Sequence, residues 1–223
     1  MKLFAALAGL AGLGAGFAVA DPIHIDFDTD AMGNPIQTGQ VIDNEYAAYG
    51  VTITTENLAP GHPDLGIAFD SANPTGGDFD LRTPNPGLHP SNTVAYDNVL
   101  IIAEDAVFDM NGNVIDPDDE GRQPAGSFTF DMTFVLTEAR FTLLDNEEPG
   151  LIQFFKDGLQ VGTAPITPTA DGAVQTIGFD AAQFNSFKVN LGGSGALADL
   201  VLVPEPGSLI LLAFGPLVLR LRR

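Results

Sequence analysis

The sequence contains no cysteine and no tryptophan, and only 9 of its 223 residues are lysine or arginine. Without cysteine the chain forms no disulfide, binds no metal through thiolates and has no cysteine nucleophile. Because nucleic-acid binding depends on clustered basic residues, their scarcity argues against a nucleic-acid partner. The motifs of nucleotide binding, zinc hydrolysis and serine hydrolysis (Walker A, G-x-G-x-x-G, H-E-x-x-H and G-x-S-x-G) are also missing.

The first twenty residues have the organisation of a secretory signal peptide. Lys2 supplies a positive charge, an apolar stretch runs from Leu3 to Phe17, and Ala18-Val19-Ala20 has the small-x-small pattern that signal peptidase accepts. We therefore expect cleavage between Ala20 and Asp21, followed by export of the remainder. A core helix is the alternative, but the segment has no polar face.

The C-terminus ends in a short apolar segment followed by basic residues. The run Leu209–Leu219 has 11 residues. As a helix it would span roughly 16 Å of a hydrocarbon core that is about 30 Å thick. Pro216 also interrupts it, and the terminal basic residues favour a cytoplasmic end: Arg220, Arg222 and Arg223. A segment of this kind suits a transient inner-membrane anchor that is later removed, as GPI signals are.

The motif Pro204-Glu205-Pro206, the short apolar segment and the terminal arginines occur in this order at the end of the chain. Together they resemble the PEP-CTERM sorting domain, which covers 204–223. The resemblance implies processing by an exosortase in a Gram-negative bacterium that exports exopolysaccharide. It places the product at the cell surface or in the extracellular matrix.

Residues 21–203 show the period-two alternation of β-strands. In Ser127–Phe134 every second residue is apolar, and Asn185–Leu191 repeats the pattern. Further strands are expected at 23–28, 50–55, 65–69, 99–103, 140–144, 151–155, 173–179 and 197–203. Turn pairs such as Asp157-Gly158 separate the expected strands. We expect an all-β domain, a two-sheet antiparallel jelly-roll-like sandwich, flanked by an N-terminal signal helix and a short C-terminal hydrophobic helix. The long connection 70–98 is either functional or a sign of a missed element.

Sequence segments such as NVLIIAED (98–105) and NLGGSGALADLVLV (190–203) resemble segments of a group of exported bacterial β-sandwich domains that carry PEP-CTERM or other anchors. The group's fold is similar to that of jelly-roll carbohydrate-binding modules. This is a likeness of fold, and a fold does not give a function.

Once the two end segments are set aside, residues 21–203 carry 5 basic and 28 acidic residues, a formal charge of −23. Bound divalent cations would relieve the repulsion, and Ca²⁺ takes six to eight oxygen ligands. The densest run is Asp116, Asp118, Asp119 and Glu120, which is either a calcium site or a solvated acidic loop. Other oxygen-rich clusters are Asp70, Asp78 and Asp80, residues 145–148, and Asp26, Asp28 and Asp30.

A second calcium hypothesis joins the two ends of the domain. In jelly-roll modules a structural calcium often bridges the first and last strands, so the resemblance implies that Asp199 faces Asp26 or Asp28. Asp199 lies in a strongly apolar strand, where a buried carboxylate without a partner would be costly. The alternative is that Asp199 points to solvent from the polar face of its strand.

The sequence therefore predicts an exported, non-catalytic binding or structural domain. Its expected partners are signal peptidase, exosortase, the membrane transiently, and an exopolysaccharide or envelope glycan. The scarcity of tyrosine and the absence of tryptophan weigh against a glycan ligand, because sugar platforms favour those rings. The alternative function is a secreted carbohydrate-active or ester hydrolase, for which no acid–base pair stands out.

Overall fold

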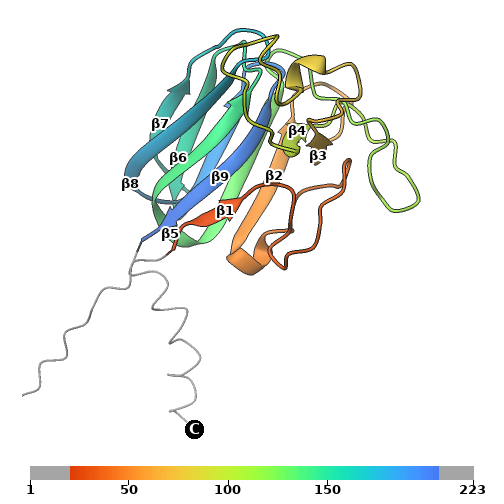
Figure 1. Ribbon diagram of the computed structural model, residues 1–223. Helices are drawn as coiled ribbons and strands as arrows, with labels where there is room; N and C mark the ends of the chain where they lie inside the picture. Colours follow the sequence, from red (N-terminus) through yellow and green to blue (C-terminus); the bar gives the residue numbers. More distant parts are fainter. Residues whose placement is uncertain (1–20, 206–223) are drawn as a thin grey trace, which may run out of the picture.

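The computed structural model of the protein describes residues 21–205 and consists almost entirely of antiparallel β-strands (Figure 1). The all-β antiparallel prediction is therefore confirmed. The strands are β1 (Ile23–Ile25), β2 (Val51–Asn57), β3 (Gly66–Asp70), β4 (Asn98–Ile102), β5 (Gly126–Leu144), β6 (Gly150–Lys156), β7 (Leu159–Ile166), β8 (Val174–Leu191) and β9 (Ala196–Pro204). Two short 3₁₀ helices lie in the connections, η1 (Ala47–Tyr49) and η2 (Phe79–Leu81).

The strands form one hydrogen-bonded sheet that folds over into two packed layers. The long strands β5 and β8 pair with each other along both of their halves. The first half of β5, residues 126–131, lies in a layer ordered β2–β5–β8–β6–β7. Its second half, residues 136–144, pairs with β9 on the other side, and β9 also pairs with β1 and β4. The two layers are thus joined through β5 and β8.

The bend in β5 falls where its pairing is irregular. The register against β8 shifts between Asp131 and Leu136, and again between Leu136 and Glu138. Bulges of this kind kink a strand and increase its twist, which lets one strand serve both layers. Segments expected as separate strands are therefore halves of one strand: 127–134 and 140–144 in β5, and 173–179 and 185–191 in β8.

Phenylalanine side chains fill the space between the layers. Phe130 and Phe187 are cross-strand neighbours in one layer, and their rings stack with centroids 4.7 Å apart. Phe179, from the other half of β8, contacts Phe154 of β6 with centroids also 4.7 Å apart. Burying an aromatic side chain stabilises the fold by about 1.5–3 kcal/mol. The apolar stripe read from the sequence is therefore the core.

A second, smaller core lies against the other face of β3, β4 and β9. Ile67 and Phe69 of β3 and Ile101 of β4 pack there with Leu81 of η2, all of them fully buried. Leu81 comes from the long connection that follows β3, so this connection is folded against the sheet. It also holds Asp78 and Asp80, which precede Leu81, beside the sheet.

The strand β7 was not expected from the sequence. It lies at the edge of the sheet, most of its side chains are exposed, and it contains Pro165. An edge strand buries little and tolerates proline, so it shows no alternation of apolar residues. The predicted Asp157-Gly158 turn is present and joins β6 to β7, and both residues have positive φ, 50° and 79°.

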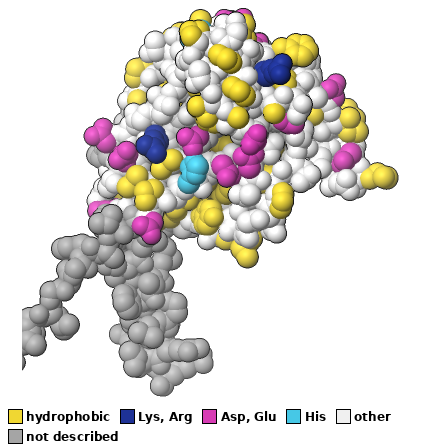
Figure 2. All heavy atoms as spheres, in the orientation of Figure 1, with side chains coloured by type: hydrophobic (Ala, Val, Ile, Leu, Met, Phe, Trp, Pro, Cys, Tyr) yellow, Lys and Arg dark blue, Asp and Glu magenta, His cyan; other side chains and the backbone are white. Residues whose placement is uncertain are grey.

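The surface seen in Figure 2 carries many more acidic than basic side chains. Pro204 is the last residue of β9 and pairs with Leu136, and the N–H of Glu205 donates to the carbonyl of Val135 at 2.8 Å. The start of the expected sorting motif is thus part of the sheet. The signal segment with Ala20, the expected C-terminal helix, and Pro206, Arg220, Arg222 and Arg223 lie outside the described residues. Within residues 21–205, no helix has the length and apolarity needed to cross a membrane.

Candidate functional site

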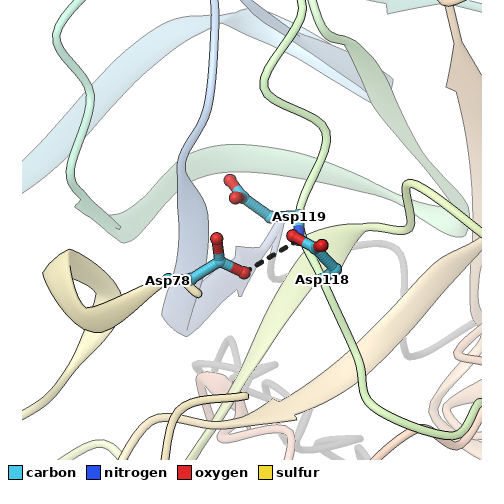
Figure 3. A group of neighbouring side chains, drawn as sticks. All are labelled: Asp78, Asp118 and Asp119. Carbon is cyan, nitrogen blue, oxygen red and sulfur yellow. Dashed lines mark hydrogen bonds between the residues drawn. The ribbon is translucent and has the colours of Figure 1, made fainter. Parts of the chain in front are cut away.

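Three aspartates from two connections converge beside η2 (Figure 3). Asp78 directly precedes η2, while Asp118 and Asp119 come from the connection between β4 and β5. Each offers a carboxylate oxygen within 4.8 Å of the others, a spacing at which they could hold a metal ion. The N–H of Asp119 donates to Oδ2 of Asp78 at 3.0 Å, which fixes the two connections against each other. We call Asp78, Asp118 and Asp119 the acidic junction.

Asp119 is the buried member of the acidic junction, with 5% of its surface exposed. Its Oδ2 accepts hydrogen bonds from Oγ of Ser194 at 2.6 Å and from the N–H of Gly195 at 2.8 Å, both just before β9. Burial nevertheless raises the pKa of Asp119. Burial, together with the charge of Asp119, raises the pKa of Asp78 to about 8. Burial and nearby acidic groups raise the pKa of Asp118 to about 6.

A second acidic group includes Asp80, which lies within η2. Asp80, Asp145 and Asp171 bring one carboxylate oxygen each within 4.8 Å of one another. Asp145 is only 2% exposed, and its Oδ1 accepts from the N–H of Gly172 at 2.6 Å. Burial, followed by the charges of Asp80, Glu147 and Asp171, raises its pKa to about 7.

In both groups the carboxylates lie close together, so their negative charges repel one another. Carboxylates that are buried together are stable when protonated or when a cation lies between them. Their donor set consists of oxygens alone, which is the set that hard cations such as Ca²⁺ and Mg²⁺ prefer. The chemistry of the residues therefore fits a hard divalent cation better than zinc or copper.

The acidic run 116–120 does not form one site. Asp118 and Asp119 meet Asp78, but Asp116 has a positive φ of 55° and its Oδ1 accepts from the N–H of Gly76 at 3.3 Å. Glu120 turns away into a separate buried network described next. The single site expected from the density of the run is thus divided, and Asp78 joins it from 40 residues upstream.

Glu120 is buried and fully hydrogen-bonded. Its Oε2 contacts Nδ1 of His62 at 2.7 Å and accepts from Nδ2 of Asn57 at 3.0 Å, while Oε1 accepts from the N–H of Arg122 at 2.9 Å. Burial acts to raise its pKa, but these partners outweigh burial and hold the pKa below its usual value. Its oxygens are engaged in holding the loops together.

Asp26, Asp28 and Asp199 lie around one hollow of about 220 Å³ with His24 and Asp97. As the second calcium hypothesis requires, the first and last strands pair, with His24 opposite Val201. Asp199 contacts Nε2 of His24, and its side chain is 43% exposed. On this face acidic side chains gather around a histidine (Figure 2).

The three carboxylates of this hollow are tied into local structure. Asp26 accepts from the N–H groups of Asp28 and Thr29, and Asp28 accepts from the N–H of Asn98 at 2.9 Å. Within residues 21–205, the three are not among the groups whose ligand atoms come within 4.8 Å of one another. A calcium ion bound by these three carboxylates stays a prediction.

A different kind of hollow lies on the solvent face of β5, β8 and β6. Its volume is about 420 Å³, and we call it the outer-face hollow. One aromatic ring, two carboxylates, an amide, hydroxyls and an ammonium group line it. The lining residues are Thr129, Asp131, Met132, Phe155, Asp157, Gly158, Asn185, Ser186 and Lys188.

Register places these side chains in rows across the layer. Asp131 lies opposite Ser186, and Ser186 lies opposite Phe155. In the next row, two residues along β5 and β8, Thr129 lies opposite Lys188. The alternation of these strands predicts polar faces, but it does not predict a site there. The signal was present, because residues that alternate with buried phenylalanines must project from the other face.

No family model matches the chain, and no curated protein matches its sequence. Among solved structures, the chain is similar to a mutant of a family 29 carbohydrate-binding module, with 19% identity and a TM-score of 0.30, covering 47% of this chain and 69% of that one. A family 32 carbohydrate-binding module bound to GalNAc shows 11% identity and a TM-score of 0.35, covering 70% and 97%. A family 32 module of a glycoside hydrolase from Clostridium perfringens shows 13% and 0.27, covering 62% and 95%. These TM-scores are too low to assign a function, which has to come from the residues themselves.

Proposed function

We propose that the chain is an exported, non-catalytic module that binds a glycan of the cell envelope or matrix in the outer-face hollow. The observation that carries this is the composition of the hollow, in which Phe155 lies beside the hydrogen-bonding groups of Asp131, Asn185 and Lys188. A sugar offers an apolar ring face and several hydroxyls that both donate and accept. Sites for small ligands combine apolar surface with a few convergent polar groups in just this way.

The polar groups of the outer-face hollow are held in place before any ligand arrives. Asn185 and Asp157 form a reciprocal pair, in which Nδ2 of Asn185 donates to Oδ1 of Asp157 at 2.9 Å and the N–H of Asp157 donates to Oδ1 of Asn185 at 2.9 Å. Nζ of Lys188 donates to Oε2 of Glu56 at 2.7 Å. Such preorganisation lowers the entropy lost on binding, which supports a binding role for this face.

Export and sorting form the second part of the proposal. Signal peptidase would cut between Ala20 and Asp21, and exosortase would act on the segment that begins at Pro204 after a transient inner-membrane stage. The sequence features of the two ends support this route to the surface or matrix of a Gram-negative bacterium. Mass spectrometry of protein recovered from cells and medium tests it, and an intact end at Arg223 would contradict the processing.

A calcium ion in the acidic junction is a second proposal. It is supported by the convergence of Asp78, Asp118 and Asp119, and by their pKa values, which burial and neighbouring acidic groups raise. The ion would tie the η2 connection to the β4–β5 connection. It would act on stability rather than on chemistry, in keeping with a non-catalytic module.

The glycan proposal is tested by affinity electrophoresis of the purified exported domain in gels that contain exopolysaccharide of the producing cell. We expect retardation of the wild-type domain, and Phe155→Ala should weaken binding by about tenfold, because loss of a ring contact costs on the order of 1–3 kcal/mol. Phe108→Ala is the matched control, since Phe108 is 46% exposed and lies outside the hollow. Equal binding by both variants would place the site elsewhere, and release of reducing ends would contradict a non-catalytic role.

A further inference from the structure

We propose that the outer-face hollow selects uncharged glycans and rejects polymers of uronic acids and other anionic sugars. This inference rests on the proposed function and adds the ligand class. It follows from the charges that surround the hollow and from the ion pair that its one basic side chain, Lys188, forms with Glu56.

The hollow has a negative balance. Asp131 and Asp157 line it with exposed carboxylates, and Lys188 is the one basic residue among its lining side chains. Glu56, the penultimate residue of β2, adds a third carboxylate beside Lys188. The formal charge of this neighbourhood is therefore negative, within a chain whose overall formal charge is −20.

The charge of Lys188 is already paired with a carboxylate of the protein. Its Nζ lies 2.7 Å from Oε2 of Glu56, and its side chain is 27% exposed. The hydrogen bond and the charge of Lys188 lower the pKa of Glu56, which keeps the Glu56 carboxylate ionised at neutral pH. Glu56 also accepts from Oγ of Ser127 at 3.4 Å, which helps to hold the carboxylate over the lysine. A sugar carboxylate would therefore meet a lysine whose charge is already neutralised by Glu56.

The hydrogen-bonding inventory points the same way. The carboxylate oxygens of Asp131 and Asp157 are hydrogen-bond acceptors, so they favour ligand groups that donate. Hydroxyl groups of a neutral sugar donate, whereas a uronate places an acceptor-only carboxylate next to them. Like charges brought together in this way weaken binding, which is how many sites exclude unwanted ligands. The acidity of the whole chain adds a longer-range repulsion.

The test compares a neutral polymer with a uronic-acid polymer, for example a galactomannan and polygalacturonate, by affinity electrophoresis of the exported domain at low and high salt. We expect the wild-type domain to be retarded by the neutral polymer at both salt concentrations and not by the polyuronate. Glu56→Gln frees Lys188 and should raise the ratio of polyuronate to neutral binding by about tenfold, the effect of one removed charge contact. Asp131→Asn, a second variant at an exposed position, should raise the ratio in the same direction.

Asp180→Asn is the control, because it removes the same charge at an exposed position outside the hollow and should leave both polymers' binding unchanged. Equal binding of both polymers by the wild-type domain would overturn this inference and leave the proposed function standing. An unchanged ratio in Glu56→Gln and Asp131→Asn would also overturn it. If no neutral polymer is bound, the proposed function fails, and the inference fails with it.

Discussion

Among single residues, Asp119 shows most clearly how the acidic junction is balanced. Its carboxylate is satisfied on one side by Ser194 and Gly195 and faces Asp78 and Asp118 on the other. An amide at this position can still accept from Ser194 and Gly195, while its NH₂ group donates towards Asp78. Asp119→Asn should therefore remove repulsion and keep the hydrogen bonds.

We expect Asp119→Asn in chelator at pH 8 to raise the Tm by roughly 2–4 °C, which corresponds to about 1 kcal/mol for a chain of this size. The rise in Tm that calcium gives the wild-type domain should shrink by more than half, because one of three carboxylate ligands is lost. Differential scanning calorimetry with and without Ca²⁺ measures both effects. Asp180→Asn should change neither, and a full calcium response in Asp119→Asn would remove Asp119 from the site.

The acidic run 116–120 also shows how far the roles of single residues can be predicted from the sequence. Its density pointed to Asp118 and Asp119, which do contribute to a cluster. Glu120, the next residue, ends instead in a separate network with His62 and Asn57. Asp78 joins through a long-range contact, and no local pattern predicts which of several distant aspartates that contact will select.

At the level of elements, alternation predicted most of the sheet. The expected strands at 50–55, 65–69, 99–103 and 151–155 correspond to β2, β3, β4 and β6 within one or two residues. Alternation reports burial on one face, so it succeeds wherever a strand covers the core and fails for the exposed edge strand β7. It also cannot tell two strands from one bent strand, because a bulge interrupts the period without ending the pairing.

The outer-face hollow is formed by side chains from several strands, and no single sequence motif encodes it. Its lining side chains come from β5, β8 and β6 and from the turn between β6 and β7, and only the register brings them together. Each strand taken alone shows an ordinary polar face. The hollow could be read from the sequence only by someone who already knew that β8 lies between β5 and β6.

Across the whole molecule, the acidic residues differ in how strongly each one affects the stability of the fold. Most acidic side chains lie at the surface, where water screens them. Asp119 and Asp145 are buried, and together with Asp78 and Asp118 they have raised pKa values. These few groups, and not the total charge, should govern how stability responds to pH and to cations.

Stability in the absence of calcium should fall as the pH rises from about 4 to about 8. The native state holds protons on Asp118 with a pKa of about 6, on Asp145 with a pKa of about 7 and on Asp78 with a pKa of about 8, whereas these groups have a pKa of 3.8 in the unfolded chain. Because the unfolded state binds fewer protons in this window, the free energy of unfolding decreases with increasing pH. Below the window the sign reverses, since Glu120 has a lowered pKa and loses its stabilising charge in acid.

Calcium should weaken this dependence, because in the acidic junction it takes the place of the protons and binds the ionised carboxylates more strongly as the pH rises. The calcium-induced increase in Tm is therefore expected to be larger at pH 8 than at pH 5. Urea unfolding at a series of pH values, in chelator and in millimolar Ca²⁺, gives both curves. A chelated protein that becomes more stable between pH 5 and pH 8 would show that the buried aspartates are compensated by the protein itself and need no cation.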